Sequence, residues 1–458
     1  MKMIDRTPMR TIPMHQRTST FEEVNLGYSK EEAIQEASRC LDCKHQPCVN
    51  GCPVGIDIPG FIKMVEQDRM DEAYRIIQGS SCLPAVCGRV CPQETQCEAL
   101  CVRGMKGEPV AIGHLERYVA DTYYQNMHHE QSIELKPKKV AVVGSGPAGL
   151  SFAHDVIKAG YQVDIYEALH TAGGVLSYGI PSFRLPKDVV KREVDRLIEQ
   201  GVHLYTDVII GKTLMLDDLH KMGYQAIFIG TGAGLPKFMN IPGEMLNGVY
   251  SANEFLTRMN LMKAYDPLSV TPIKKGKRVA VIGGGNVALD AARAARRLGA
   301  DIVYLIYRRS MQEIPARHEE VEHAIEEGII FKLLTQIKEI HGDDEGFVKS
   351  IVCCEMILGE PDESGRRRPI ENPKKMMVFH VDEVIMAIGT TPNPLITSNQ
   401  HGLNTTSQGC LVVNQVTNET SIPMVFAGGD VVTGSATVIL AMEAGRQAAK
   451  AVIERFEG

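Results

Sequence analysis

Nine of the twelve cysteines lie before residue 102, in two groups whose spacing suits iron–sulfur chemistry. Thiolates this close together can wrap a cluster from a single loop, and a proline after the last cysteine is typical of bacterial cluster-binding runs. The first group ends in such a proline and consists of Cys40, Cys43, Cys48 and Cys52. The second group consists of Cys87, Cys91, Cys97 and Cys101, and Cys82 is the ninth cysteine. The two groups together predict [4Fe-4S] ligation.

Structural zinc and unligated buried cysteine are the alternatives to iron–sulfur ligation. Zinc uses four ligands, usually in paired CxxC units. A disulfide framework suits a small secreted domain, whereas a long chain without a signal sequence favours metal binding. Two four-iron clusters need about eight ligands, and nine cysteines are available. The spacing alone leaves open which cysteines are spare.

A glycine-rich motif at residues 144–149 follows an apolar run and precedes a helical pattern. Such glycines form a tight turn and let a pyrophosphate approach the N-terminus of a helix. The next predicted strand ends in an acid whose carboxylate can bind the adenosine ribose. The predicted site residues of this motif are Gly144, Gly146, Pro147, Ala148, Gly149 and Glu167.

Near the C-terminus, residues 425–430 are predicted to form a strand and a glycine–acid turn, followed by a helix rich in small residues. An acid at this turn can bind a flavin ribityl chain, and the helix N-terminus can point at the isoalloxazine ring. This segment assigns the first dinucleotide site to FAD. Its predicted contributors are Gly429, Asp430, Thr437 and Val438.

A second glycine-rich motif occupies residues 283–288, and its next strand ends in two arginines where the first unit has an acid. Guanidinium groups bind a 2′-phosphate, which a carboxylate would repel, so the motif predicts an NADPH site. Its residues are Gly283, Gly285, Asn286, Ala288, Arg308, Arg309 and Arg317. A solvated turn at Arg308 and Arg309, and a surface position for Arg317, are the alternatives.

Three structural parts must position these sites. Residues 1–135 are expected to form a helical domain with two [4Fe-4S] clusters, with a capped helix start at Ser29, helices over 59–79 and a linker over 123–139. Buried parallel strands are predicted at 139–143 and 278–282. The fold class is α/β with two Rossmann-like domains. The NADP(H)-binding domain (251–379) is inserted within the FAD-binding domain (136–250 and 380–458).

The composition excludes several classes of protein. The chain has 458 residues, 44% apolar and 23% charged, with a net charge of −7. These values fit a multidomain globular protein and give no reason to expect nucleic-acid binding. Neither a signal core nor a membrane span is predicted, so a cytoplasmic location is expected.

The sequence resembles the glutamate synthase small-subunit family. Within that family it is most similar to the large subunits of NADH-dependent ferredoxin:NADP oxidoreductases, which are flavin-bifurcating transhydrogenases. The runs at residues 39–43, 52–59, 83–92 and 109–117 carry this resemblance.

The resemblance implies a ligand set that the spacing could not choose. One four-iron cluster would be held by Cys40, Cys43, Cys48 and Cys101. The other would be held by Cys52, Cys91, Cys97 and the carboxylate of Glu116. Cys82 and Cys87 would remain unligated. The resemblance also implies FAD contacts from Gly174, Leu176 and Arg184.

The implied activity is hydride exchange between NADPH and FAD, with electrons passing through the two clusters. No catalytic proton donor is predicted, because hydride transfer needs ring orientation rather than an acid or a base. The expected partners are ferredoxin and a smaller subunit with FAD and a [2Fe-2S] cluster.

Three other functions are weighed against this one. The first is the small subunit of glutamate synthase, which would pass electrons to the glutamate-forming large subunit. The second is a non-catalytic binding or scaffold flavoprotein. A disulfide reductase fits poorly, because Cys353 and Cys354 are adjacent and neither dinucleotide motif is followed by a CxxC pair.

Overall fold

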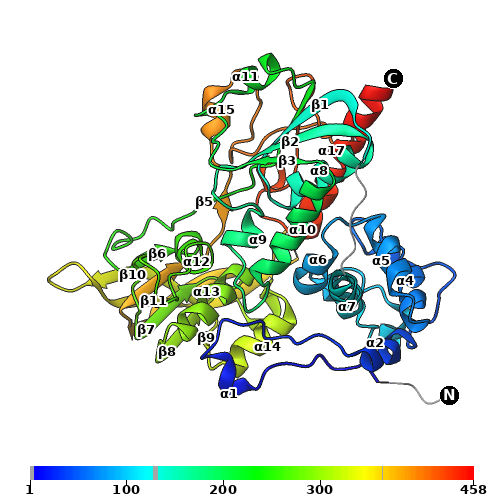
Figure 1. Cartoon of the computed structure of the whole chain (residues 1–458). Coiled ribbons are helices and arrows are strands. Elements are labelled where there is room, and N and C mark those ends of the chain that lie inside the picture. The colour runs from blue at the N-terminus through cyan, green and yellow to red at the C-terminus, as the bar shows by residue number, and fades with distance from the viewer. Residues whose placement is uncertain (1–4, 127–132, 364) are drawn as a thin grey trace.

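A computed structural model describes residues 5–126, 133–363 and 365–458. The N-terminal part is a helical domain (Figure 1). Its helices are α1 (Met14–Arg17), α2 (Lys30–Ala37), α3 (Pro47–Asn50), α4 (Ile58–Glu66), α5 (Met70–Gln78), α6 (Pro84–Val90) and α7 (Ile112–Gln125). The expected cap is confirmed, because the Ser29 hydroxyl accepts from Glu32 N and the Glu32 carboxylate accepts from Ser29 N.

The first dinucleotide unit, called the first unit below, is built on a five-stranded parallel sheet in the order β15-β4-β1-β2-β3. Its strands are β1 (Lys136–Val143), β2 (Tyr161–Tyr166), β3 (His203–Tyr205), β4 (Ala226–Ile229) and β15 (Val425–Ala427). Its helices include α8 (Pro147–Lys158), α9 (Val175–Tyr178), α10 (Lys187–Glu199), α11 (Leu216–Lys221), α15 (Leu395–Asn399), α16 (Asp430–Thr433) and α17 (Val438–Glu457). The strand β1 begins at Lys136, so the expected linker over 123–139 is too long at both ends, and its residues 127–132 lie outside the described residues. The helix α7 reaches Gln125, and the strand includes the lysines assigned to the linker.

The second dinucleotide unit, called the second unit, has a parallel sheet in the order β6-β13-β7-β8-β9. These strands are β6 (Val249–Ser251), β7 (Arg278–Ile282), β8 (Ile302–Ile306), β9 (Ile330–Lys332) and β13 (Glu383–Met386). Its helices are α12 (Ala252–Asn260), α13 (Asn286–Arg297) and α14 (His318–Glu326). An antiparallel sheet that the sequence did not predict extends from this unit, formed by β10 (Thr335–Gly342), β11 (Val348–Pro361) and β12 (Arg367–His380).

The second unit is inserted into the first, because β15 completes the first sheet after the chain has passed through the second. The two connections pair with each other as β5 (Leu235–Pro236) and β14 (Thr390–Thr391). The predicted end of the NADP(H)-binding domain at residue 379 falls too early. β13 comes after it and pairs with β6 and β7 of the second sheet.

The N-terminal arm, residues 10–26, runs beneath the second unit, where α1 lies close to α14 (Figure 1). Val24 N donates to Phe183 O of the first unit, and Phe21 stacks on Tyr265 of the second with ring centroids 4.1 Å apart. The arm therefore contacts both dinucleotide units. Within the described part of the chain, no helix is long and apolar enough to cross a membrane.

Candidate functional site

The loop between β1 and α8 is shaped for close approach to a phosphate. Gly144 has a φ of +100°, and a Cβ there would lie 2.7 Å from Gly230 O. A Cβ at Gly149 would lie 2.0 Å from Gly144 O, so only glycine fits between the loop and the helix. A Cβ at Gly146, which caps α8, would meet no atom within 4 Å among the described residues. The chain thus leaves space at the N-terminus of α8, whose first turn contains Pro147 and Ala148. A bound dinucleotide requires such a space.

Glu167 directly follows β2 and is buried. Its carboxylate accepts hydrogen bonds from Ser145 N (2.9 Å), Ser145 Oγ (2.5 Å) and Leu169 N (2.9 Å). These bonds hold the carboxylate beside the glycine loop, where the sequence predicted a ribose ligand. Ser145, which the sequence analysis passed over, is the residue that fixes it.

The residues around α9 lie against the same loop. Gly174 has a φ of +54°, and a Cβ there would lie 2.8 Å from Gly146 Cα. Leu176 is fully buried. Tyr178, which no sequence motif indicated, is half-buried and interacts electrostatically with both Asp430 and Glu167. Burial, followed by these two charges, raises the pKa of Tyr178 to about 12.

The C-terminal segment completes this site. A Cβ at Gly429 would lie 3.0 Å from the Ala148 side chain, so the glycine–acid turn contacts the first turn of α8. Asp430 accepts from Ala436 N at 3.1 Å, and burial raises its pKa to about 6. Thr437 caps α17 by accepting from Leu440 N, so Val438 begins a 20-residue helix whose positive end faces this region. The residues predicted for FAD in these segments are therefore brought together, with Arg184 as the exception.

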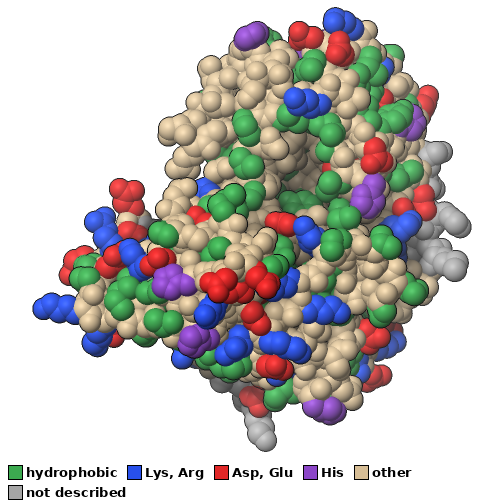
Figure 2. Space-filling model, turned by 90° about the vertical axis from the view of Figure 1, so that its left-hand side faces the viewer, with side chains coloured by type: hydrophobic (Ala, Val, Ile, Leu, Met, Phe, Trp, Pro, Cys, Tyr) green, Lys and Arg blue, Asp and Glu red, His purple; other side chains and the backbone are tan. Residues whose placement is uncertain are grey.

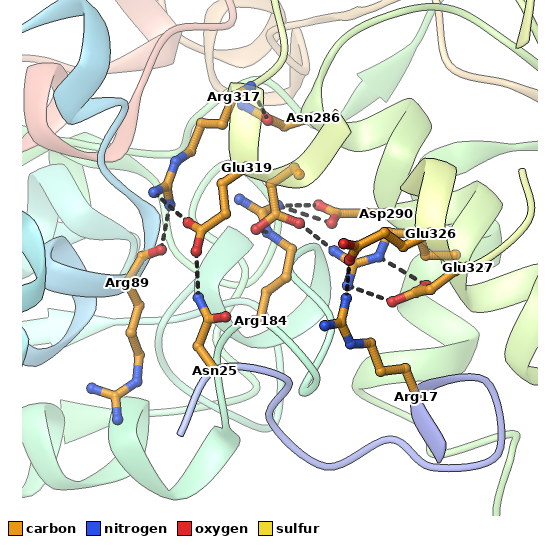
Figure 3. Close-up of polar contacts among 12 residues, drawn as sticks. Arg17, Asn25, Arg89, Arg184, Asn286, Asp290, Arg317, Glu319, Glu326 and Glu327 are labelled. Carbon is orange, nitrogen blue, oxygen red and sulfur yellow. Dashed lines mark hydrogen bonds and ion pairs between the residues drawn. The ribbon is translucent and has the colours of Figure 1, made fainter. Parts of the chain in front are cut away.

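Arg184 lies instead between the two units, in the network of Figure 3. Its Nη1 donates to both Asp290 oxygens at 2.7 and 2.9 Å, and its Nε pairs with Glu320 at 3.0 Å. Asp290 and Glu320 belong to α13 and α14 of the second unit. Arg184 thus joins the first unit to the second through buried ion pairs.

The glycine loop of the second unit repeats the geometry of the first. Gly283 has a φ of +145°, and a Cβ there would lie 2.4 Å from Ala387 O. A Cβ at Gly285 would meet nothing within 4 Å among the described residues, which leaves space at the start of α13. Ala288 is fully buried, and the Asn286 side chain accepts from Arg317 N at 3.1 Å.

The three arginines predicted for the 2′-phosphate occupy different environments. Arg308 is exposed and has no hydrogen-bond or ion-pair partner within the described chain. Arg309 is buried and donates to Asp362 at 2.6 Å. Arg317 is also buried rather than on the surface, and it donates to Arg89 O at 2.5 Å and Glu319 at 3.0 Å (Figure 3). The structure therefore does not bring the three guanidinium groups together.

In the outer cysteine group, Cys40 and Cys43 lie on the loop between α2 and α3, Cys48 lies in α3, and Cys101 directly precedes a short 3-10 helix. The Cys40 thiol interacts with those of Cys43 and Cys101, and the Cys48 thiol interacts with those of Cys40 and Cys101. Burial, with these neighbouring thiols, raises the pKa of Cys48 to about 11. The four sulfurs implied for one cluster therefore share one locality, half-buried near the surface.

The inner group is more deeply buried and includes a carboxyl group. Glu116 on α7 interacts electrostatically with the thiols of Cys52, Cys91 and Cys97. Its Oε1 is buried without a hydrogen-bond partner among the described residues, and burial raises its pKa to about 8. An orphaned buried carboxyl beside three thiols fits a ligand position, because iron would supply the missing partner.

No three His, Cys, Asp or Glu side chains among the described residues are placed to hold a single metal ion. A tetrahedral zinc site would need thiolates about 4 Å apart, whereas the corners of a four-iron cluster place them farther from one another. The two groups therefore fit clusters in their soft donor chemistry and in their grouping.

Cys82 and Cys87 are buried between the helical domain and the first unit. The Cys87 thiol donates to Met442 Sδ of α17 at 3.5 Å. Burial raises the pKa of the Cys82 thiol well above its usual range.

Seen from the side of the second unit, the molecule is hollowed between its upper and lower parts, and apolar side chains surround the hollow (Figure 2).

Two protein families match this chain along consecutive segments. Residues 17–128 match the family described as dihydropyrimidine dehydrogenase domain II, 4Fe-4S cluster. Residues 138–448 match the pyridine nucleotide-disulphide oxidoreductases. The first segment contains all nine clustered cysteines and Glu116, and the second contains both glycine loops.

Curated relatives match nearly the whole chain. The glutamate synthase [NADPH] small chain of Escherichia coli is 34% identical, over 97% of this chain and 96% of its own length. The NADP(+)-dependent formate dehydrogenase subunit beta of Moorella thermoacetica is 38% identical over 89% of this chain. This chain spans only 59% of the length of that subunit.

Solved structures agree with the fold. FprA of Mycobacterium tuberculosis, in complex with NADPH, matches 70% of this chain and 85% of its own, with a TM-score of 0.60 and 21% identity. The resemblance given by the cysteine and glycine motifs and the fold class are thereby confirmed. The chain is a pyridine nucleotide-linked oxidoreductase with a 4Fe-4S domain, and it belongs to the glutamate synthase small-subunit family.

Proposed function

We propose that this chain is the NADPH-oxidising, FAD-containing subunit of an electron-bifurcating transhydrogenase, with ferredoxin and a smaller FAD and [2Fe-2S] subunit as its partners. When bound, FAD would exchange a hydride with NADPH, and two [4Fe-4S] clusters would carry single electrons. The names of its relatives support NADPH as the reductant, since several use NADPH or NADP(+).

The contact between α6 and α17 carries this proposal. The helix α6 leads to Cys91, an implied ligand of the inner cluster, and α17 begins at the predicted FAD site. The two helices meet where Cys87 Sγ and Met442 Sδ lie 3.5 Å apart. A cluster held by Cys91 would thus lie close to the element that closes the flavin site.

The chain's own residues have three roles in this proposal. The two glycine loops orient the dinucleotides, with Glu167 on one ribose and Arg308 on the 2′-phosphate of the other. Cys40, Cys43, Cys48 and Cys101 hold the outer cluster. Cys52, Cys91, Cys97 and Glu116 hold the inner cluster.

Anaerobic titration of the purified chain with NADPH tests the proposal. The expected result is bleaching of the flavin band followed by electron paramagnetic resonance signals from two reduced clusters, with about eight iron atoms per chain. Glu116→Ala should change the signal of one cluster, whereas Glu108→Ala, on the exposed surface, should change neither. Flavin bleaching without cluster reduction would contradict the electron relay.

The small subunit of glutamate synthase is the second candidate, favoured by the match along 96% of the E. coli small chain. Co-purification from the native source separates the two. A smaller flavoprotein with a [2Fe-2S] cluster supports the transhydrogenase, and a large glutamate-forming subunit supports the alternative. A chain purified without flavin and without NADPH-dependent bleaching would support a scaffold instead.

A further inference from the structure

Asp362, which follows β11, and Arg367, which begins β12, lie against the turn that follows β8, more than fifty residues earlier in the chain. Arg309 Nη2 donates to Asp362 Oδ2 at 2.6 Å, and Arg309 Nε donates to Arg367 O at 2.8 Å. These bonds hold the end of the hairpin formed by β11 and β12. It lies beside the position where a Rossmann unit binds the adenosine ribose.

Two nitrogens of the Arg309 guanidinium, Nε and Nη2, are already engaged by these contacts. Only 8% of its side chain is exposed, and its guanidinium has a carboxylate and a carbonyl as partners. Binding a 2′-phosphate would require Arg309 to break a charge-assisted hydrogen bond in a buried setting. Arg308, in contrast, is exposed and unpaired within the described chain.

Arg367 is held at the same turn but still faces solvent. Its Nε donates to Glu313 at 2.6 Å, and its Nη2 donates to Gln312 at 3.2 Å and to Ser310 at 3.4 Å. Its side chain is 42% exposed, and its Nη1 has no partner among the described residues. The turn therefore orients this guanidinium and leaves one edge of it available.

We infer that Arg367 is the second cation of the adenosine 2′-phosphate subsite, acting with Arg308, and that Arg309 is a positioning residue that holds the hairpin end. This inference rests on the proposed use of NADPH. Two guanidinium groups (Arg309, Arg367) and two carboxylates (Asp362, Glu313) pair at this corner, and the exposed Arg308 directly precedes Arg309 in the chain. A phosphate would select Arg308 and Arg367, which face solvent, because only 8% of the Arg309 side chain is exposed.

Binding of 2′,5′-ADP and of 5′-ADP to the holoprotein, measured by calorimetry, tests this inference. Arg308→Gln and Arg367→Gln should each weaken 2′,5′-ADP binding by about tenfold or more, since each removes a charge-assisted hydrogen bond. Neither should change 5′-ADP binding, which also reports that the second unit remains folded. Arg368→Gln is the matched control, because Arg368 is exposed, adjacent and unpaired within the described chain, and it should bind both nucleotides normally.

Two further variants test the roles of Arg367 and Arg309 separately. Arg367→Lys keeps the charge without the planar fork and should recover part of the 2′,5′-ADP affinity. Arg309→Gln should lower the melting temperature and weaken 2′,5′-ADP binding less than Arg367→Gln does.

Normal 2′,5′-ADP binding by Arg367→Gln, with weakened binding by Arg308→Gln, would overturn the role of Arg367. A loss in Arg309→Gln as large as that in Arg308→Gln, at unchanged melting temperature, would make Arg309 a phosphate ligand. If the wild-type protein binds the two nucleotides equally, the use of NADPH itself is wrong.

Discussion

The helices that follow the two glycine loops have the same place in their folds but are stabilised in different ways. The helix α8 packs so closely on α17 that a Cβ at Gly445 would lie 2.2 Å from Ala148 O. The helix α13 instead buries Asp290, Arg293 and Arg297. Close packing of helices stabilises the first unit, whereas buried ion pairs stabilise the second unit and its contacts with neighbouring parts.

The largest expected effect is on the charged side of this comparison. Glu327 is fully buried and accepts four hydrogen bonds from Arg293 and Arg297. Glu327→Gln leaves Arg297 without its counter-charge and Arg293 with Glu320 alone, and we expect a loss of about 3 to 5 kcal/mol in the free energy of unfolding. Urea unfolding followed by circular dichroism measures it.

Glu326→Gln is the neighbouring control. Glu326 pairs with Arg17 of the arm, but 42% of its side chain is exposed, so we expect a loss below about 1 kcal/mol. Equal losses in the two variants would mean that burial does not determine how much each ion pair contributes to the free energy of unfolding.

The pH dependence should differ in sign between the units. Burial opposes ionisation of Glu320 and Glu327, yet neighbouring arginines lower both pKa values to about 2. Since these values lie below the usual 4.3 or so, the second unit should lose stability as pH falls from about 4.5 to 2, by on the order of 3 kcal/mol per group. Burial raises the pKa of Asp430 to about 6, so its contribution should become more favourable as pH falls from about 6 to 4.

Hydrogen exchange of peptides from each unit, corrected for the intrinsic rate at each pH, separates the two trends. Glu327→Gln should reduce the loss of stability that α13 and α14 show as the pH falls. A parallel acid loss in both units would remove the contrast.

Gly445→Ala probes the close packing of the first unit. The added methyl group would press on Ala148 O and Phe152 N, and we expect a loss of about 2 kcal/mol together with weaker flavin binding. Melting temperature and flavin content measure the two effects. Gly234→Ala is the control, because a Cβ there meets nothing within 4 Å of the described chain, and equal stability of the two variants would refute close packing.

The smallest effect is expected at Tyr307, which occupies in the second unit the position of Glu167 in the first. Its hydroxyl donates to Glu313 O at 2.7 Å. Tyr307→Phe should cost about 1 kcal/mol and leave NADPH affinity unchanged. A large loss of NADPH affinity, measured by calorimetry, would show that this position contacts the nucleotide in both units.

Features encoded by neighbouring residues could be predicted from the sequence. The Ser29 cap, both glycine loops and the strand before each depend on patterns within a few residues. The contacts of Arg309 and Arg317 could not be predicted, because Asp362 and Arg89 are distant in sequence. Arg317 is buried, so the surface position that was the alternative to phosphate binding is wrong.

The sheet of β10 to β12 was missed for a different reason. Residues on β12 are largely exposed, so the strand lacks the apolar run that marked the buried strands. The site residue Tyr178 was missed because only its three-dimensional position, near Asp430 and Glu167, distinguishes it from an ordinary tyrosine.

The N-terminal arm has a consequence for biosynthesis. Arg17 is translated 309 residues before its partner Glu326, and Thr20 accepts from Arg297, also translated much later. At ribosomal rates of about 5 to 20 residues per second, Arg17 and Thr20 wait roughly 15 to 60 s for these partners. The helical domain can therefore emerge and compact first, and the arm forms these contacts with the second unit only after Glu326 has been translated.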